Sequence, residues 1–277
     1  MKKQFPSALN DYVFKLIFGD QRNVDILADF LQSVLTLPPD EYDYLTIIDP
    51  FIKREEETGK MSILDVKVHT TTGRIIDVEI QVAPAPEMAQ RMLSYAAGLL
   101  RGQIRKGGKY EDVRQVICIV ITNFVMAPEE KDYFNEISLR YAASGREFTD
   151  ALKFITLELP KLPRQDDAKE VWGWLSFLKS QRKEELMELV ERNPRLRKPV
   201  GILMKLSDDE RESLIFEAQE RFRMDTESRI DWAKRQGAKE QEEKEKREIA
   251  RKMKTDGLPL EKISGYTGLS ADEIQAL

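Results

Sequence analysis

The spacing of apolar positions predicts two helices near the start of the chain. In NVDILADFLQSVL, residues 23–35, apolar side chains recur every three or four positions, as on the buried side of a helix. Asn23 is a suitable N-cap, and the prolines of the following LPPD cannot continue the helix. Just upstream, DYVFKLIFGD has the same kind of spacing. It predicts a shorter helix that ends at Gly19.

The next segments change from helical spacing to the two-residue alternation of β-strands. YLTIIDPFIKREEE predicts one or two strands that are interrupted at Pro50. The segments MSILDVKVHT and IIDVEIQVA, residues 61–70 and 75–83, are separated by the turn sequence TTGR. Together they predict a β-hairpin.

Helical and strand patterns then alternate up to about residue 165. Residues 86–108 predict an amphipathic helix, and the nearly continuous apolar run 113–124 predicts a buried central strand. The weaker pattern of residues 131–144 favours a helix, and residues 152–163 predict a strand that ends at prolines. The order α-β-β-β-α-β predicts an α/β fold, a mixed sheet with helices on its faces.

The chain divides by composition into three predicted parts. Residues 1–165 carry the α/β core, and residues 166–224 show no strand pattern and predict a helical extension. Residues 225–277 begin with a highly charged helix, which suits either a solvated helix with i,i+4 ion pairs or a coiled-coil partner.

The last residues predict a small helical hairpin. A helix begins at Leu260, a turn follows at GYTG, and Ser270 with Glu273 forms a capping-box pattern. The spacing is similar to that of DNA-binding helix-turn-helix units. Because the second helix, SADEIQAL, is acidic and offers no Arg or Lys to a groove, a packing or dimerisation hairpin is favoured.

The composition excludes several kinds of chemistry. The 277 residues contain one cysteine, Cys118, and one histidine, His69, which exclude an intrachain disulfide framework and a His/Cys zinc site. We expect Cys118 to be a buried small hydrophobe. No glycine-rich phosphate loop is present, so carboxylates, lysines and amides remain, and these favour Mg²⁺ or another hard cation. Without a signal-peptide pattern or a long apolar run, the expectation is a cytoplasmic protein without a membrane span.

The predicted hairpin gathers acids on one face. The two-residue period places Asp65 on the polar face of the first strand, and Asp77, Glu79 and Gln81 on that of the second. If the apolar faces cover one core, the polar faces coincide and bring Asp65 near Glu79 and Gln81. Two such carboxylates suit a divalent cation. The alternative, an edge hairpin with solvated acids, stays open at this point.

Asp65 on one strand and Glu79-Ile80-Gln81 on the next resemble the motif of the PD-(D/E)XK nuclease superfamily, a central Asp followed by acid-x-Lys. Gln81 stands where Lys is usual, which is similar to the Rpn family of recombination-promoting nucleases, also described as putative transposases. DYVFKLIFGD, RMLSYAAGLLRGQIRKGGKY and GLPLEKISGYTGLSADEIQAL resemble that family as well, so the likeness spans most of residues 8–160 and returns at 245–277.

The resemblance implies a restriction-endonuclease-like αβββαβ core and a metal-dependent DNA endonuclease that promotes recombination or transposition. Asp65 and Glu79 would bind Mg²⁺, with Mn²⁺ or Ca²⁺ as substitutes, and the carbonyl of Ile80 would complete the ligand set. Gln81 would be the third catalytic residue and would orient water or a phosphate oxygen. Being neutral, it cannot supply the charge of a Lys. Asp77 either supports the site or faces solvent.

The helix after the hairpin carries the candidate DNA contacts. Arg91, Tyr95 and Gln103 lie on one helical stripe and could meet phosphate and sugar. A basic patch follows around Gly107 and Gly108, formed by Arg101, Arg105, Lys106 and Lys109. The alternatives are that Tyr95 packs between helix and sheet, and that the cations serve the helix C-terminus.

Three functions therefore remain for the chain: a Mg²⁺-dependent endonuclease acting on DNA, which we favour, a noncatalytic interaction module that forms a homodimer through its C-terminal helices, and a DNA binder that uses the C-terminal hairpin. The net charge of −5 means that any DNA contact must come from a local basic patch. The resemblance to the nuclease superfamily also implies that an acid from the first helix joins the metal site, and the pattern does not choose among Asp11, Asp20 and a residue such as Glu41.

Overall fold

The computed structural model describes residues 5–48, 65–85, 87–104, 108–206, 208–216 and 244–277, without the side chains of Asp11 and Asp65. The strand interruption expected at Pro50 and the basic residues Arg105 and Lys106 lie outside these ranges. The chain separates into two compact units, residues 1–218 and 219–277, and each is described by itself. The expected boundaries near residues 165 and 224 stay a prediction.

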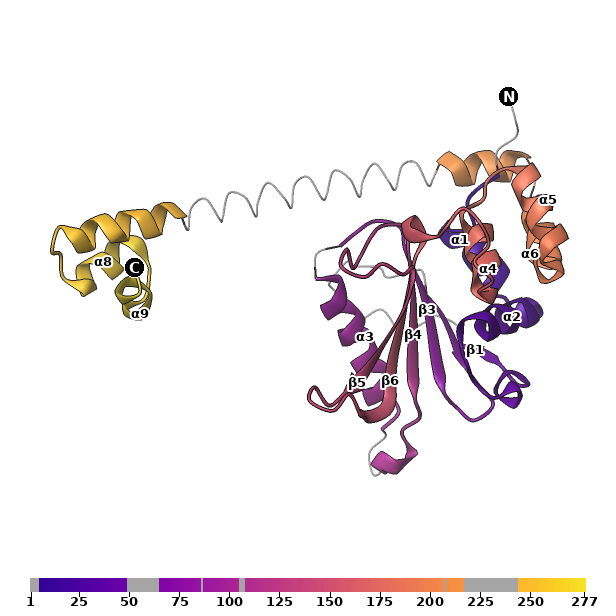
Figure 1. Cartoon of the computed structure of the whole chain (residues 1–277), viewed down its shortest axis with the longest axis horizontal. Coiled ribbons are helices and arrows are strands. Elements are labelled where there is room, and N and C mark those ends of the chain that lie inside the picture. The colour runs from indigo at the N-terminus through magenta and orange to yellow at the C-terminus, as the bar shows by residue number, and fades with distance from the viewer. Residues whose placement is uncertain (1–4, 49–64, 86, 105–107, 207, 217–243) are drawn as a thin grey trace. The chain divides into compact units, whose positions relative to one another are not determined.

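A mixed sheet forms the centre of the first unit (Figure 1). Its six strands within the described residues lie in the order β1-β2-β3-β4-β6-β5. Strands β3, β4 and β6 are parallel, and the pairs β1–β2, β2–β3 and β5–β6 are antiparallel. This confirms the predicted α/β fold. The strands are β1 (Thr46–Ile48), β2 (Asp65–His69), β3 (Ile75–Gln81), β4 (Val116–Thr122), β5 (Phe134–Arg140) and β6 (Glu147–Glu158).

Helices cover both faces of this sheet. The larger core joins one face to helices α1 (Asp11–Phe18), α2 (Val24–Val34), α4 (Glu170–Lys179), α5 (Lys183–Arg192) and α6 (Arg197–Met204), as Figure 1 shows. Leu214, from the helical residues 208–216, belongs to the same core. The other face packs against α3 (Met88–Gly102). Short 3₁₀ turns complete the unit: η1 (Gln21–Asn23), η2 (Pro39–Tyr42), η3 (Tyr110–Asp112), η4 (Leu159–Lys161) and η5 (Pro194–Leu196).

An aromatic cluster ties α4 to the N-terminal helices. The Phe18 ring lies 5.5 Å from Phe30 and 6.0 Å from Trp174, measured between centroids. Phe30 and Trp174 meet edge to face at 5.8 Å. All three side chains are at most 1% exposed. The helices that follow residue 166 therefore share the core of the N-terminal part of the chain.

The ends of the first helices follow their sequence signals with one difference. Asn10 caps α1 by accepting hydrogen bonds from the backbone N–H groups of Tyr12 and Val13, and α1 ends at Gly19 as predicted. Asn23 lies at the predicted N-cap of α2, but its side chain does not cap that helix. Instead its Nδ2 donates to the carbonyl of Leu16, 3.0 Å away, and links the two helices.

Substitution of Gly19 by Ala is expected to destabilise the first unit. An added Cβ would lie 2.9 Å from the carbonyl oxygen of Lys15, and a backbone atom cannot move away cheaply. We expect Gly19→Ala to lower the unfolding free energy by about 1–3 kcal/mol, measured by urea denaturation. Gly98→Ala is the matched control, because nothing lies within 4 Å of its added Cβ. It should leave stability unchanged or raise it by about 1 kcal/mol. Equal destabilisation by both variants would contradict this explanation.

The helix expected at residues 131–144 is wrong, because the segment contains strand β5. This edge strand hydrogen-bonds only with β6 within the described residues, and Ile137 and Leu139 remain 46% and 44% exposed. Irregular register around Ser138 further disturbs the alternation. The strand therefore depends on hydrogen bonds from β6, which the local pattern does not reveal. Strand β6 itself begins at Glu147, before the predicted start at residue 152.

Residues 244–277, the described part of the second unit, form a short three-helix arrangement. Residues 244–255 are helical and are followed by α8 (Leu260–Thr267) and α9 (Ala271–Gln275). Their core consists of Ala250, Ile263, Leu269 and Ile274. The capping box of Ser270 and Glu273 is confirmed. Helix α8 extends through the predicted GYTG turn to Thr267, and Gly268, with φ 73°, makes the turn.

Candidate active site

The register of β2 and β3 brings the predicted acids opposite one another. Asp65 pairs with Glu79, and Lys67 pairs with Asp77. Directly opposed residues project to the same face of a sheet, with Cβ atoms about 5 Å apart. The backbone therefore places residue 65 on the face that carries Glu79.

Strand β4 continues this face on the other side of β3. Cys118 lies beside Asp77, Val120 beside Glu79, and Thr122 beside Gln81. Helix α3 covers the β4 part of the face, where Met88 and Met92 pack on Val120. The acids of β3 therefore lie between the apolar underside of α3 and strand β2.

Burial distinguishes these acids from those of an ordinary strand surface. Asp77 is 5% exposed and Glu79 is 6% exposed, and Lys67, opposite Asp77 on β2, is 9% exposed. The alternative of an edge hairpin with solvated acids is therefore wrong for Asp77 and Glu79. Buried charges are costly unless cationic or hydrogen-bonding groups compensate them. The structure thus encloses two acids and a lysine on this face of the sheet.

Gln81 contacts Glu79 directly. Its Nε2 donates a hydrogen bond to Oε1 of Glu79. Its backbone carbonyl accepts from the N–H of Asn123, 2.9 Å away, which fixes the end of β3 against the loop after β4. Gln81 therefore orients the carboxylate of Glu79, and as a neutral amide it brings no charge of its own.

The thiol of Cys118 lies close enough to Asp77, Glu79 and Lys67 for their charges to change its pKa. Burial, with a smaller contribution from the carboxylates of Asp77 and Glu79, raises the pKa of this thiol to about 12, and Lys67 acts in the opposite direction. Cys118 is 4% exposed and stays a neutral thiol near pH 7. The predicted buried small hydrophobe is confirmed.

Glu158 is a buried acid that the sequence pattern did not single out. It ends β6, is fully buried, and lies in the same row as Gln81 through their common neighbour Thr122. Its carboxylate accepts from the N–H of Met126 at 2.8 Å and pairs with Lys161 at 2.9 Å. Glu158 thus anchors the loop after β4. The sequence signal that could have identified Glu158 is its position as a charged residue directly after an apolar run.

The acids considered from the first segment can now be placed in part. The carboxylate of Glu41 is 3% exposed, pairs with Arg74 and accepts from Thr72 Oγ1 at 2.7 Å, so it binds the β2–β3 turn. Asp20 binds its neighbour Arg22, which lowers the pKa of Asp20 to about 2. Both acids are therefore engaged away from Glu79. The side chain of Asp11 lies outside the described atoms.

The predicted DNA contacts on and after α3 have different surroundings. Arg91 is half-buried and Tyr95 is 42% exposed, so Tyr95 is not packed between helix and sheet. Gln103 is held by Arg114, whose carbonyl accepts from Nε2 at 3.0 Å and whose N–H donates to Oε1 at 2.8 Å. Lys109 is exposed and pairs with Glu111 at 2.9 Å.

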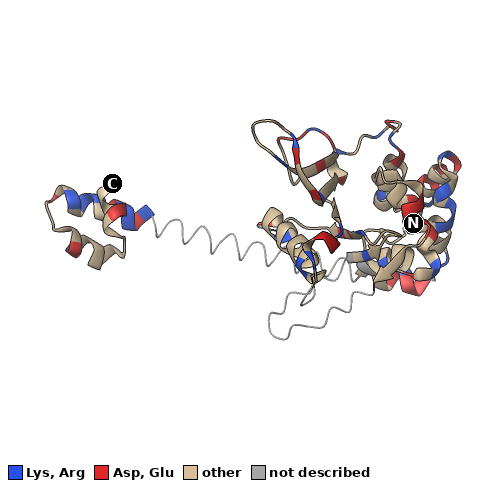
Figure 2. Cartoon of the chain, turned by 90° about the horizontal axis from the view of Figure 1, so that it is seen from below, with Lys and Arg blue, Asp and Glu red and all other residues tan. Residues whose placement is uncertain are grey.

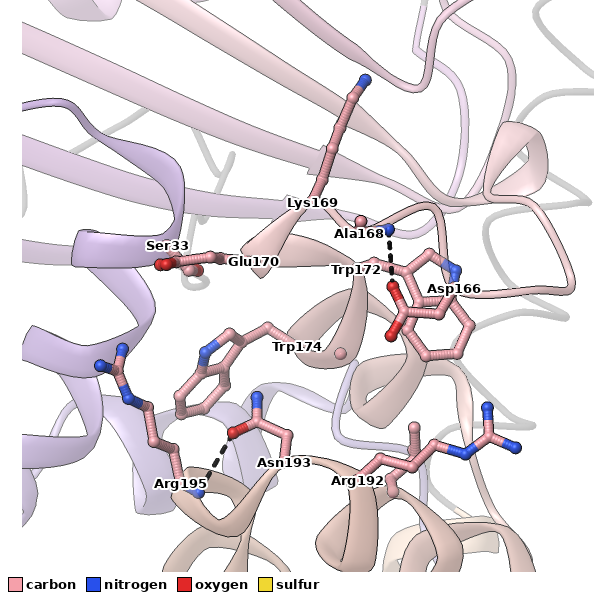
Figure 3. A pocket seen from close by; sticks show the side chains of 12 residues that line it. Ser33, Asp166, Ala168, Lys169, Glu170, Trp172, Trp174, Arg192, Asn193 and Arg195 are labelled. Atoms are coloured by element: carbon pink, nitrogen blue, oxygen red, sulfur yellow. Dashed lines mark hydrogen bonds between the residues drawn. The ribbon is translucent and has the colours of Figure 1, made fainter.

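A hollow of about 290 Å³ lies in the helical layer on the opposite face of the sheet (Figure 3). Three of its charged groups are already engaged, because Arg192 pairs with Glu188 at 2.6 Å, Lys169 pairs with Asp132 at 3.1 Å, and Asp166 accepts from the N–H of Ala168. None of the acids of β3 lines it. We therefore assign it no part in the candidate site.

The described residues contain neither an assembled metal cluster nor a helix suited to cross a membrane. No group of three or more His, Cys, Asp or Glu side chains in these ranges could hold a metal ion. The side chain of Asp65 is not among the described atoms, so this statement does not include it. The same ranges contain no helix that is long and apolar enough to cross a membrane.

Comparison with known proteins gives one match. A family model described as PD-(D/E)XK nuclease family transposase matches residues 8–233. No curated protein and no solved structure matches the chain significantly.

Proposed function

Because the chain belongs to the PD-(D/E)XK nuclease family of transposases, we propose that it is a metal-dependent DNA endonuclease acting in recombination or transposition. The observation that carries the proposal is the backbone register, which sets Asp65 opposite Glu79 on a buried face. The nuclease class follows from the family, whereas the metal, the cleavage mode and the biological role are our proposal.

The donor groups fit a hard divalent cation. Asp65 and Glu79 offer carboxylate oxygens, and the carbonyl of Ile80 would add a third oxygen. Mg²⁺ is commonly bound through one or two carboxylates, with water and substrate phosphate as the other ligands. Two protein carboxylates are therefore sufficient, and Mn²⁺ or Ca²⁺ would find the same oxygens. When bound, the ion would lower the pKa of a water molecule and neutralise charge on the phosphate.

The side chains of the protein would orient the reactants. Gln81 holds Glu79 through Oε1 and would position water or a phosphate oxygen. In the hydrolysis, the water oxygen bonds to phosphorus and one phosphorus–oxygen ester bond breaks. One water hydrogen goes to the departing oxygen, and the other stays on the new phosphate monoester until it ionises. Met88 and Met92 shield the β4 side of the face from solvent.

The DNA would approach over α3. Figure 2 shows acidic and basic residues interspersed over both units, so attraction of DNA has to be local. We propose Arg91, Tyr95, Gln103 and Lys109 as contacts, together with Arg105 and Lys106. Gln103 would contact DNA while its amide stays hydrogen-bonded to the backbone of Arg114.

Arg91→Ala is expected to weaken DNA binding at all sequences and to reduce the slope of log affinity against log salt by about one. Fluorescence anisotropy of a labelled duplex over a salt series, with a chelator to prevent cleavage, measures both quantities. Arg192→Ala is the matched control, because this arginine lies on α5 at the other face of the sheet. A change of the same size in both variants would contradict a specific contact at Arg91.

Plasmid nicking tests the proposed function. The protein should convert supercoiled DNA to open circles with Mg²⁺ or Mn²⁺, should stop on chelation, and should resume when the ion is restored. Asp65→Asn should be inactive, because the amide keeps the shape of Asp65 and removes its charge. Nicking that continues in this variant would count against the assignment.

The alternative is a noncatalytic module that forms a homodimer through its C-terminal helices. Two observations favour it: the neutral Gln81, and the separate core of the second unit. Absence of Mn²⁺ binding in calorimetry, combined with a dimer in sedimentation that is lost on removal of residues 219–277, would support it. Because Cys118 is buried as a thiol, we also keep a reducing, cytoplasmic location as a proposal.

A further inference from the structure

The candidate site contains more negative charge than its motif compensates. Asp65, Asp77 and Glu79 share one face of the β2–β3 hairpin, and Gln81 brings no positive charge to it. A nuclease site also has to stabilise a phosphate group, whose negative charge adds to that of the acids. A cation from elsewhere in the fold is therefore needed beside the metal position.

Lys67 occupies the place where such a cation would act. It lies directly opposite Asp77 in the register, and it follows Asp65 by two residues on the same face. Glu79 is its diagonal neighbour, at about 7–8 Å between Cα atoms. The four-carbon stem of lysine spans such a distance.

Two observations place the ammonium group within the site rather than in solvent. Lys67 is only 9% exposed, whereas lysine side chains usually reach water. In addition, the register sets Lys67 opposite Asp77 and Asp77 beside Cys118, and the charge of Lys67 lowers the pKa of the Cys118 thiol that Asp77 and Glu79 raise.

We propose that Lys67 is a catalytic residue of this site, whose ammonium group binds a non-bridging oxygen of the scissile phosphate and supplies the positive charge that Gln81 lacks. The inference rests on the proposed nuclease function. Lys67 forms and breaks no covalent bond. It stabilises the charge that accumulates on the phosphate oxygens while water attacks and the departing oxygen leaves.

A purely structural Lys67 would give a different pattern of effects. If the ammonium only compensates Asp77, removing it leaves buried acids together and loosens the whole site, including its metal binding. If the ammonium acts on the phosphate, its removal lowers the cleavage rate but takes away a charge that repels the metal ion. Metal binding then becomes tighter, by about tenfold at low salt.

The test compares single-turnover cleavage and Mn²⁺ calorimetry for the full chain and its variants. Lys67→Gln should cleave about 100-fold more slowly than the unchanged protein and bind Mn²⁺ at least as tightly. The double variant Lys67→Gln/Gln81→Lys returns a cation to the same face and should recover at least tenfold of the lost rate. Lys153→Gln is the matched control, because this partly buried strand lysine pairs with Glu136 on the other face of the sheet and should change neither quantity.

Three outcomes would overturn the inference. The first is cleavage by Lys67→Gln at the normal rate. The second is loss of Mn²⁺ binding in both Lys67→Gln and the double variant, which indicates a structural role. The third is failure to fold of both Lys67→Gln and Lys67→Met, the latter avoiding a new buried amide. An unchanged protein without metal-dependent cleavage would overturn the proposed function and this inference together, whereas an active protein with an equally active Lys67→Gln would overturn the inference alone.

Discussion

Glu79→Gln is expected to reduce metal-dependent DNA cleavage by at least about 1000-fold. The amide keeps the shape of the side chain and its contact with Gln81, but it removes the charge that binds a divalent ion. Mn²⁺ binding in calorimetry should fall with the cleavage rate. The fold should be retained, because Glu79 lies buried beside other acids and loss of its charge relieves repulsion among them. Thermal melting should therefore show an unchanged or raised midpoint.

Glu136→Gln is the control for this experiment. Glu136 is a strand acid that pairs with Lys153 at 2.9 Å on the other face of the sheet. Its loss should leave cleavage and Mn²⁺ binding unchanged. If Glu79→Gln cleaves DNA at more than about a tenth of the normal rate, Glu79 does not hold the catalytic ion. If it melts far below the unchanged protein, the lost activity reflects unfolding and does not identify a metal ligand.

Trp174→Ala is expected to lower the unfolding free energy of the first unit by about 3–5 kcal/mol. Trp174 is 1% exposed and contacts Phe18 and Phe30, so its removal leaves a cavity at the junction of α1, α2 and α4. Urea denaturation followed by far-ultraviolet circular dichroism measures the change. The midpoint should move to lower urea with the slope preserved.

Tyr110→Ala is the matched aromatic control. Tyr110 is 85% exposed in η3, so its loss removes little buried surface and should change stability by less than about 0.5 kcal/mol. A loss below about 1 kcal/mol for Trp174→Ala would show that α4 does not share the core of the N-terminal helices. The helices after residue 166 would then fold separately from the sheet.

The sequence was sufficient to predict the hairpin and the central strand for a specific physical reason. β2 and β3 each have one face in the larger core, where Val66, Val68, Ile76 and Val78 are buried. Their other face carries the polar side chains of the candidate site, so apolar and polar residues alternate with a strict two-residue period. β4 is buried on both faces, which gives the continuous apolar run 116–122. Burial imposed these patterns, so they could be recognised without the fold.

Strand β5 lacked such a pattern because it lies at the sheet edge. Its residues are half-buried or exposed, and β6 supplies the hydrogen bonds that make it a strand. A local pattern cannot report a partner that lies further along the chain. The same limit applies to the first residues of β6, where Glu147 and Phe148 are exposed and give no apolar signal.

For the candidate site, the pattern predicted the face of each residue but not its depth or its partners. Asp77 and Glu79 were compatible with a solvated surface until the strands on both sides and α3 placed them inside. Pairing across strands also decides the position of Lys67 opposite Asp77. Likewise, the link between Gln103 and Arg114 depends on how the chain returns from α3 to β4.

A Gln in place of the usual Lys need not remove a nuclease activity from this fold. Gln81 still orients the carboxylate of Glu79 through its hydrogen bond. The positive charge that the usual Lys would supply then has to come from another residue. If Lys67 on the neighbouring strand supplies the charge, the two tasks of the usual Lys are divided between two residues. This division predicts that moving the lysine between positions 67 and 81 changes the rate of cleavage more than the affinity for the ion.

The proposed function depends on Asp65 and Glu79 binding one divalent ion together. Crystals soaked in Mn²⁺ and measured for anomalous scattering test this most directly, because the ion is located without reference to activity. We predict one strong anomalous peak between the two carboxylates, within about 2.0–2.2 Å of an oxygen from each. A peak elsewhere in the first unit, or side chains of residues 65 and 79 that turn away from each other with no ion between them, would contradict a shared metal site.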